Sequence, residues 1–319
     1  MKFAVALLIT AFAALTVWGQ SPPTLHIVTE IPNLPSDLYY GNTKVKPLRL
    51  RPGTNTPITI NDADFFVNQQ YVDFLSRFPD QSGFDFWTNQ ITACGANATC
   101  VDGLRTNISG AFFLSIEFQE TGYLVERMYK VAYGDAQAQS TDGGAHPILV
   151  PIVRRSEFLP DTLEISNGVI VNQGNWQALL ESNKVAFAND FVSRSRFTTA
   201  YAGMSNSQFV DTLNSNAGNP LSTTERNQLV SDLTGGAKTR AQVVRAVAED
   251  QDLNVAEKNK AFVLMQYFGY LRRDPNSGPD TDYSGYDFWL KKLNAHGGDF
   301  HAAEMVRSFL VAGEYLNRF

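Results

Sequence analysis

Two stretches far apart in the chain, FVNQQYVDFLSR at 66–77 and FVLMQYFGYLRR at 262–273, are copies of one pattern. In both copies a proline stands two residues beyond the final arginine, at Pro79 and at Pro275. A second pattern of Ser-Gly-aromatic-Asp-Phe-Trp then follows, as SGFDFW at 82–87 and SGYDFW at 284–289. Similarity between segments of one chain is the sequence signature of a repeat architecture.

The remaining sequence supports about four copies of this unit. Three copies close with two aromatic residues six positions apart, namely Phe112 and Phe118, Phe191 and Phe197, and Phe309 and Tyr315, while the degenerate third copy closes near 244–250. The predicted boundaries are 61–122 for the first repeat, 123–205 for the second with a long surface insertion at 134–174, 206–255 for a degenerate third, and 256–319 for the fourth.

Within each copy the apolar residues recur at helical spacing, separated by breaks. One short helical unit cannot bury its apolar faces alone, so the copies must pack against each other. The sequence therefore predicts an all-α fold of tandem helical repeats, packed into one helical bundle or a short stack. We expect its core anchors to be Tyr71, Trp87, Trp176, Tyr267 and Trp289.

The Ser-Gly-aromatic-Asp pattern predicts a helix start. A serine followed three residues later by an acid is typical of a capping box, in which each side chain bonds a backbone N–H at the helix N-terminus. We expect Ser82 with Asp85, and Ser284 with Asp287, to cap the middle helix of their copies. The acids that recur in the copies are then explained by the fold.

The N-terminal sequence predicts export. Lys2 precedes an apolar run from Phe3 to Leu15, which is typical of a secretory signal peptide, with cleavage expected after Gly19. Residues 20–60 are rich in Pro, Thr, Asn and Ser, which indicates an extended linker with a strand near 25–29. The mature chain carries a net charge of −7, and it contains no further stretch apolar enough to span a membrane. Such an acidic chain lacks the basic face that nucleic acid requires.

Cys94 and Cys100 are the two cysteines of the chain. In an oxidising compartment a pair at this spacing is expected to form a disulfide. A metal site would need further His or Cys ligands nearby, and a redox motif would have two residues between the cysteines rather than five.

One loop has some of the spacing of a calcium site. Asp280, Asp282, Ser284 and Asp287 place oxygens at intervals, with a glycine at the sixth position of the loop. The twelfth position, however, is Lys291 rather than a bidentate glutamate, and a solvated turn is the simpler interpretation. The sequence predicts no other cofactor, and it shows no nucleophile, metal or paired-carboxylate constellation.

These motifs resemble the bacterial "domain of unknown function 4214" family. The resemblance rests on Phe-Val-x-x-Gln-Tyr, Leu-x-Arg-x-Pro, Gly-aromatic-Asp-Phe-Trp and the closing Ser-Ile-Glu-Phe of 115–118, and it extends over roughly 62–319. It implies an exported bacterial protein with a helical fold similar to phycobilisome linker domains. It implies no catalytic residues.

Taken together, these features predict a non-catalytic structural or binding module of the bacterial cell envelope or exterior. Secretion would place it in the periplasm, at the cell surface or outside the cell. Its partner would be a protein or polysaccharide of the cell surface, recognised by the inter-helix loops or by the 134–174 insertion. The alternative is a secreted hydrolase acting on cell-wall or polysaccharide material, an interpretation that export and the acidic residues favour.

Overall fold

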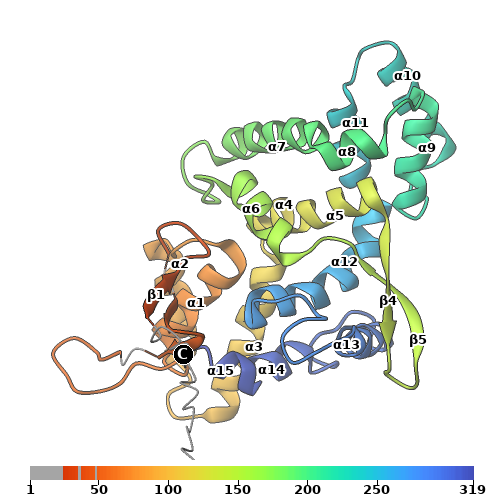
Figure 1. The fold of residues 1–319 in the computed structure, drawn as a ribbon. Coiled ribbons are helices and arrows are strands. Elements are labelled where there is room, and N and C mark those ends of the chain that lie inside the picture. Colours follow the sequence, from red (N-terminus) through yellow and green to blue (C-terminus); the bar gives the residue numbers. More distant parts are fainter. Residues whose placement is uncertain (1–23, 35–36, 47–48) are drawn as a thin grey trace, which may run out of the picture. The chain divides into compact units, whose positions relative to one another are not determined.

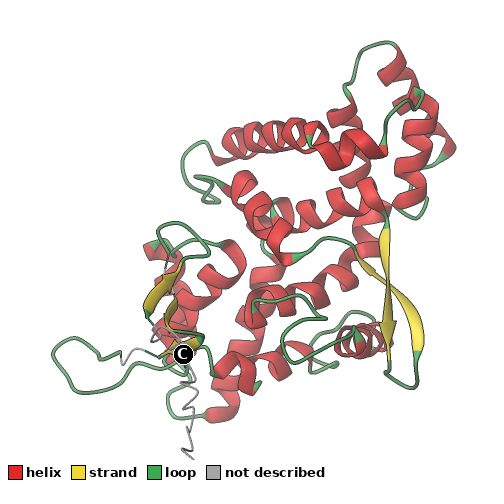
Figure 2. Cartoon of the chain, viewed as in Figure 1, coloured by secondary structure: helices red, strands yellow, loops and turns green. Residues whose placement is uncertain are grey.

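The computed structural model describes residues 24–34, 37–46 and 49–319, and helix predominates among them (Figures 1 and 2). The chain divides into two compact units, one ending at Pro47 and one beginning at Leu48. The predicted signal peptide and its cleavage site lie outside the described residues. None of the described helices is both long enough and apolar enough to cross a membrane.

The N-terminal unit contains a three-stranded antiparallel sheet. Its strands are β1 (Leu25–Val28), β2 (Asp37–Tyr40) and β3 (Thr43–Val45), in that order across the sheet. The strand expected near 25–29 is present as β1. The rest of this segment is not the plain extended linker that its composition indicated, because Gly41 adopts a left-handed conformation in a two-residue turn that pairs β2 with β3.

The larger unit begins with four helices that cover the predicted first repeat, namely α1 (Ala63–Leu75), α2 (Gln81–Thr92), α3 (Ala98–Leu114) and α4 (Ile116–Glu120). The next four are α5 (Gly122–Tyr133), α6 (Arg155–Ser166), α7 (Trp176–Ser193) and α8 (Ser195–Ala200). The middle of the chain then forms α9 (Asn206–Asn216), α10 (Thr223–Thr234) and α11 (Arg240–Ala248). The last segment comprises α12 (Gln251–Gln266), the π-helical turn η1 (Tyr267–Leu271), α13 (Ser284–Ala295), α14 (Met305–Leu310) and α15 (Gly313–Leu316).

The 134–174 insertion is more ordered than the surface excursion we expected. It forms a hairpin of β4 (Asp135–Ser140) and β5 (His146–Pro151), followed by α6. Figure 1 shows the hairpin running from the end of α5 towards α13. The backbone N–H of Tyr283 donates to the carbonyl of Gln139 at 3.0 Å, so the insertion is tied to the last segment of the chain.

The first and last segments pack directly on each other. The rings of Phe74 and Tyr270 meet edge to face with centroids 5.1 Å apart. Gly269 allows this approach, since a Cβ there would lie 3.2 Å from the Phe74 ring. The buried Gln70 amide oxygen accepts hydrogen bonds from the hydroxyls of Tyr270 at 3.0 Å and Ser109 at 2.9 Å. Buried polar groups need such partners.

Both predicted capping boxes are wrong. Helix α2 starts two residues earlier than predicted, and Asp80 caps it by accepting from the N–H of Gly83 at 3.0 Å. Asp80 follows Pro79, which ends the preceding segment, so a capping residue is available before Ser82. In the last segment Asp287 does not cap α13 but accepts from the Ser140 hydroxyl of the hairpin at 2.6 Å.

Candidate functional site: two matched clefts

Two surface clefts lie at corresponding places in the first and last helical segments. The first cleft, of about 200 Å³, is lined by Tyr71, Leu75, Arg77, Asp80, Trp87, Ala111, Phe112, Ser115, Ile116, Glu117, Val171 and Asn172. The second cleft, of about 210 Å³, is lined by Tyr267, Leu271, Arg273, Asp280, Trp289, Ser308, Phe309, Ala312 and Glu314. Every residue that lines the second cleft except Asp280 aligns with one that lines the first, and Asp280 takes the place beside the arginine that Asp80 has in the first cleft.

The floor of each cleft is an edge-to-face aromatic pair. Tyr71 and Phe112 have centroids 4.7 Å apart at 84°, and Tyr267 and Phe309 have centroids 5.3 Å apart at 75°. Edge-to-face contact is a favourable arrangement of aromatic rings because the positive edge meets the negative face. In the first and last copies, these pairs place a closing aromatic residue, Phe112 or Phe309, on the tyrosine near the start of the copy.

An arginine–glutamate pair spans each cleft. Arg77 donates to both carboxylate oxygens of Glu117 at 2.7 and 2.8 Å, and Arg273 donates to both oxygens of Glu314 at 2.6 and 3.0 Å. Burial lowers the pKa of Arg77, but the hydrogen bond and charge of Glu117 outweigh burial and leave this pKa above its usual value. Two parallel bonds fix the geometry as well as adding stability.

The same helix ending positions both arginines. Ser76 and Arg272 adopt left-handed backbone conformations, with φ of 54° and 52°. The next backbone N–H in each case, that of Arg77 or Arg273, donates to the carbonyl of Tyr71 or Tyr267. This six-residue closure is typical of a Schellman-type C-terminus. It turns the chain so that the arginine lies beside the tyrosine that precedes it.

A second carboxylate approaches each arginine. The Asp80 carboxylate lies 3.8 Å from the Arg77 guanidinium, and Asp280 lies 2.7 Å from that of Arg273. The hydrogen bond from Ser82 lowers the pKa of Asp80, and the Gly83 N–H and Arg77 lower it further against the opposing effect of burial. Each cleft therefore carries one guanidinium and two carboxylates, a formal charge of −1.

The glycine that faces the tyrosine in each cleft is required for a steric reason. A Cβ on Gly83 would lie 2.1 Å from the Tyr71 hydroxyl oxygen, and one on Gly285 would lie 2.5 Å from that of Tyr267. Both distances are far inside van der Waals contact, so only glycine fits while the tyrosine keeps its place. The glycine of each Ser-Gly-aromatic-Asp-Phe-Trp motif makes room for the tyrosine.

The predicted anchors differ in depth. Tyr71 and Tyr267 are buried, whereas Trp87 and Trp289 are half-buried, packing on the core with one side and lining a cleft with the other. Beside them in sequence, Phe86 is 59% exposed and Phe288 is 43% exposed. The tryptophans are thus boundary residues that a ligand in the cleft can touch.

Trp176 stands apart from this arrangement. The second segment repeats the aromatic floor with Tyr129 and Phe191, whose centroids are 5.2 Å apart at 77°. Trp176, however, is half-buried in a different pocket, which it shares with Ile116, Glu120, Gln177, Leu180, Glu181 and Lys184. The structure therefore does not bring Trp176 onto the Tyr129–Phe191 pair.

The residues of the candidate calcium loop contact several different partners. Asp280 pairs with Arg273, while the Asp282 carboxylate accepts from the N–H of Ser284 at 2.9 Å. Asp287 accepts from Ser140 and from Lys291, the latter at 2.7 Å. Burial raises the pKa of Asp287, but Lys291 and Ser140 outweigh it and hold that pKa below its usual value. Within the described ranges, no three His, Cys, Asp or Glu side chains gather in a way that could hold a metal ion.

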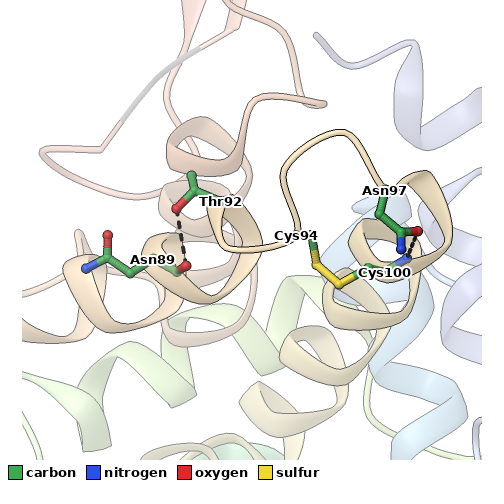
Figure 3. Close-up of a disulfide and its surroundings, with 5 residues drawn as sticks. All are labelled: Asn89, Thr92, Cys94, Asn97 and Cys100. Carbon is green, nitrogen blue, oxygen red and sulfur yellow. Dashed lines mark hydrogen bonds between the residues drawn. A yellow bond between two sulfur atoms is a disulfide. The ribbon is translucent and has the colours of Figure 1, made fainter.

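The predicted disulfide between Cys94 and Cys100 is present (Figure 3). It joins the end of α2 to the start of α3, with the two Cα atoms 5.6 Å apart. The Asn97 side chain lies inside this loop and accepts from the N–H of Cys100 at 3.1 Å, which caps α3. The loop is on the surface and holds the two helices that flank the first cleft.

Sequence reasoning missed the arginine–glutamate pairs, although a signal for them exists. Arg77 and Glu117 are 40 positions apart, and Arg273 and Glu314 are 41 apart. Opposite charges that recur at nearly the same interval in two copies indicate a contact between them.

Comparison of this chain with profiles of known protein families, with curated protein sequences and with solved structures yields no match. The resemblance of the repeated motifs to the "domain of unknown function 4214" family stays a prediction from the residues themselves. Function is therefore argued from the clefts.

Proposed function

We propose that this chain is an exported, non-catalytic binding module of the bacterial cell envelope or exterior, built from degenerate copies of one helical unit. The observation that carries the proposal is the cleft that occurs twice with the same aromatic floor, the same tryptophan and the same arginine–glutamate pair. A binding surface gains from duplication because two modest sites on one body add in avidity. A single reaction centre gains nothing comparable.

The chemistry of the clefts favours holding a ligand over transforming one. A general acid or base must give or take a proton, and a nucleophile needs a base beside it. Both oxygens of Glu117 and of Glu314 are occupied by a guanidinium. Asp80 serves as a helix cap, and Asp280 pairs with Arg273. These carboxylates support the geometry of the cleft, which suits a rigid recognition surface.

Two further observations support export and the repeat. A disulfide is typical of proteins in oxidising compartments, and Cys94–Cys100 accords with the signal-peptide pattern of the first residues. The tyrosine–phenylalanine floor recurs in three of the four predicted copies, at centroid distances of 4.7, 5.2 and 5.3 Å. Recurrence of the same contact in successive segments is expected when each segment is a copy of one unit.

The proposal is tested by measuring, in the same samples, whether the protein stays bound to the polymer and whether it releases soluble products from it. Purified mature protein is incubated with isolated bacterial envelopes and with cell-wall polysaccharide, and soluble products are followed by chromatography while bound protein is measured by sedimentation. We expect retention without released products. Release of products that stops on Asp80→Asn or Asp280→Asn would overturn the proposal in favour of the secreted hydrolase.

A further inference from the structure

We propose that the two clefts bind neutral pyranose units of one polysaccharide chain, each cleft taking one sugar ring. This inference rests on the proposed binding function and names its ligand. Three features of the clefts support it. They are the duplication of the cleft, its size and lining, and the pairing of its arginine with carboxylates and an aromatic ring of the same chain.

Duplication points to a repeating ligand. The second cleft repeats the tyrosine, arginine, tryptophan, phenylalanine and glutamate of the first. Two sites with the same side chains recognise the same chemical group. A polymer of one sugar presents that group many times along one chain, so two like clefts on one body give such a ligand two places to bind and raise its avidity.

Size and lining point to one sugar ring. Each cleft is about 200 Å³, below the range of roughly 300–1,000 Å³ usual for drug-sized ligands. One wall is the exposed side of a tryptophan, and the rim carries a guanidinium and carboxylates. A pyranose has an apolar face of C–H groups that packs on an aromatic ring. Its hydroxyl edge both donates to carboxylates and accepts from guanidinium.

The matched charges point to a neutral sugar. The Arg77 guanidinium lies 5.0 Å from the centroid of the Tyr71 ring, and that of Arg273 lies 5.4 Å from the Tyr267 centroid. These guanidiniums already cover the tyrosine rings that an ammonium ligand would need, and they leave the tryptophan walls of the clefts to an uncharged ring. An acidic sugar is repelled by the net charge of −1 in each cleft.

The remaining carboxylate in each cleft would attract a cation, which makes a basic peptide the competing ligand. A lysine side chain offers no flat face to the tryptophan and brings its charge close to Arg77 or Arg273. A neutral ring has neither disadvantage. We therefore expect neutral oligosaccharides to bind and oligolysine to fail.

The experiment is calorimetric titration of the mature protein with cellohexaose, laminarihexaose, maltohexaose, xylohexaose and hexa-N-acetylchitohexaose. A galacturonate hexamer and hexalysine are the charged competitors. We expect saturable binding of at least one neutral hexamer. Trp87→Ala and Trp289→Ala should each weaken that binding at least tenfold, and the double variant should abolish it. Trp176→Ala is the matched control, because Trp176 is also half-buried but lines neither cleft.

A variant that leaves the core untouched covers the case in which a tryptophan variant unfolds. Asp280 is 42% exposed and lines only the second cleft, so Asp280→Asn should weaken binding there and leave the melting temperature unchanged. Failure of all five neutral hexamers, preference for either charged hexamer, or binding that survives the double tryptophan variant would overturn the inference. None of these outcomes involves released products, so the wider binding proposal is judged separately.

Discussion

The first and second clefts share their contacts but differ in how far water reaches the glutamate, while both arginines are largely buried, Arg77 at 19% and Arg273 at 12% exposed. The Glu117 side chain is 5% exposed and that of Glu314 is 35% exposed. The first cleft is bordered by Val171 and Asn172, which lie beyond α6 in the loop before α7, and no such loop borders the second. The insertion of the second segment thus borders the first cleft and not the second.

The difference indicates that the same arginine–glutamate pair contributes mainly to stability in the first cleft and is more accessible to a ligand in the second. A pair removed from water is costly to break, because the remaining charge loses both its partner and its solvent. An exposed pair of the same geometry contributes little to stability and is screened by salt. The first cleft should therefore be the more structural of the two, and the second the more accessible to a ligand.

Removing the glutamates tests this contrast and should give the largest effect. We expect Glu117→Ala to lower the free energy of unfolding by about 3 kcal/mol, because Arg77 is left in a largely enclosed site without its partner. Glu314→Ala should cost less than about 1 kcal/mol, since Glu314 is partly exposed and Asp280, at 2.7 Å, still pairs with Arg273. Urea unfolding of both variants measures the difference. Equal losses would show that exposure does not distinguish the clefts.

The disulfide is present beside the first cleft only, and its loss is expected to have the next largest effect. Opening the Cys94–Cys100 loop frees the unfolded chain, which should cost about 2–3 kcal/mol on the chain-entropy interpretation. The double change Cys94→Ser and Cys100→Ser is compared with reduced wild-type protein in thermal melts. The two should agree within error. A variant as stable as the oxidised protein would contradict the prediction.

The glycines give a third contrast, in which the defect can be repaired. Gly83→Ala should cost about 1–3 kcal/mol, the range for overpacking, because the new methyl group meets the Tyr71 hydroxyl. Gly285→Ala meets only the Tyr267 hydroxyl and at a longer distance, so it should cost less. Removing the hydroxyl with Tyr71→Phe should restore most of the loss in the double variant. A double variant no more stable than Gly83→Ala would point to backbone strain instead.

These contrasts also show how far the sequence could lead. The helices of the outer copies are predictable because apolar residues recur at helical spacing up to Pro79 and Pro275, where the helix must have ended. The disulfide is predictable because the chain has one pair of cysteines, close together. Both predictions depend on residues that are close together in the sequence, where local spacing and residue type determine the structure.

What could not be predicted depends on contacts between distant segments. Strand β4 reads DAQAQS, a polar stretch with little strand propensity, and it is held by β5 and by α13. Asp287 was expected to cap its own helix, but Ser140 from the hairpin takes its carboxylate instead. The clefts themselves need Arg77 beside Glu117, a pairing that follows only once the helices are packed.

The smallest expected effect concerns the aspartates that approach the two arginines. The pKa of Asp80 is lowered in the folded protein, so its contribution to stability is present at neutral pH and is lost as pH falls through the folded pKa. Asp80→Asn keeps a capping side chain but removes the charge that favours a helix N-terminus. We expect this variant to be about 0.5–1 kcal/mol less stable than wild type at pH 7, with the gap closing in acid. Asp280→Asn is the matched control, because Asp280 also lies beside an arginine but caps no helix, and it should leave stability at pH 7 nearly unchanged. Urea unfolding between pH 3 and pH 7 measures both, and a gap for Asp80→Asn that stays constant with pH would show that shape, not charge, makes Asp80 the cap of α2.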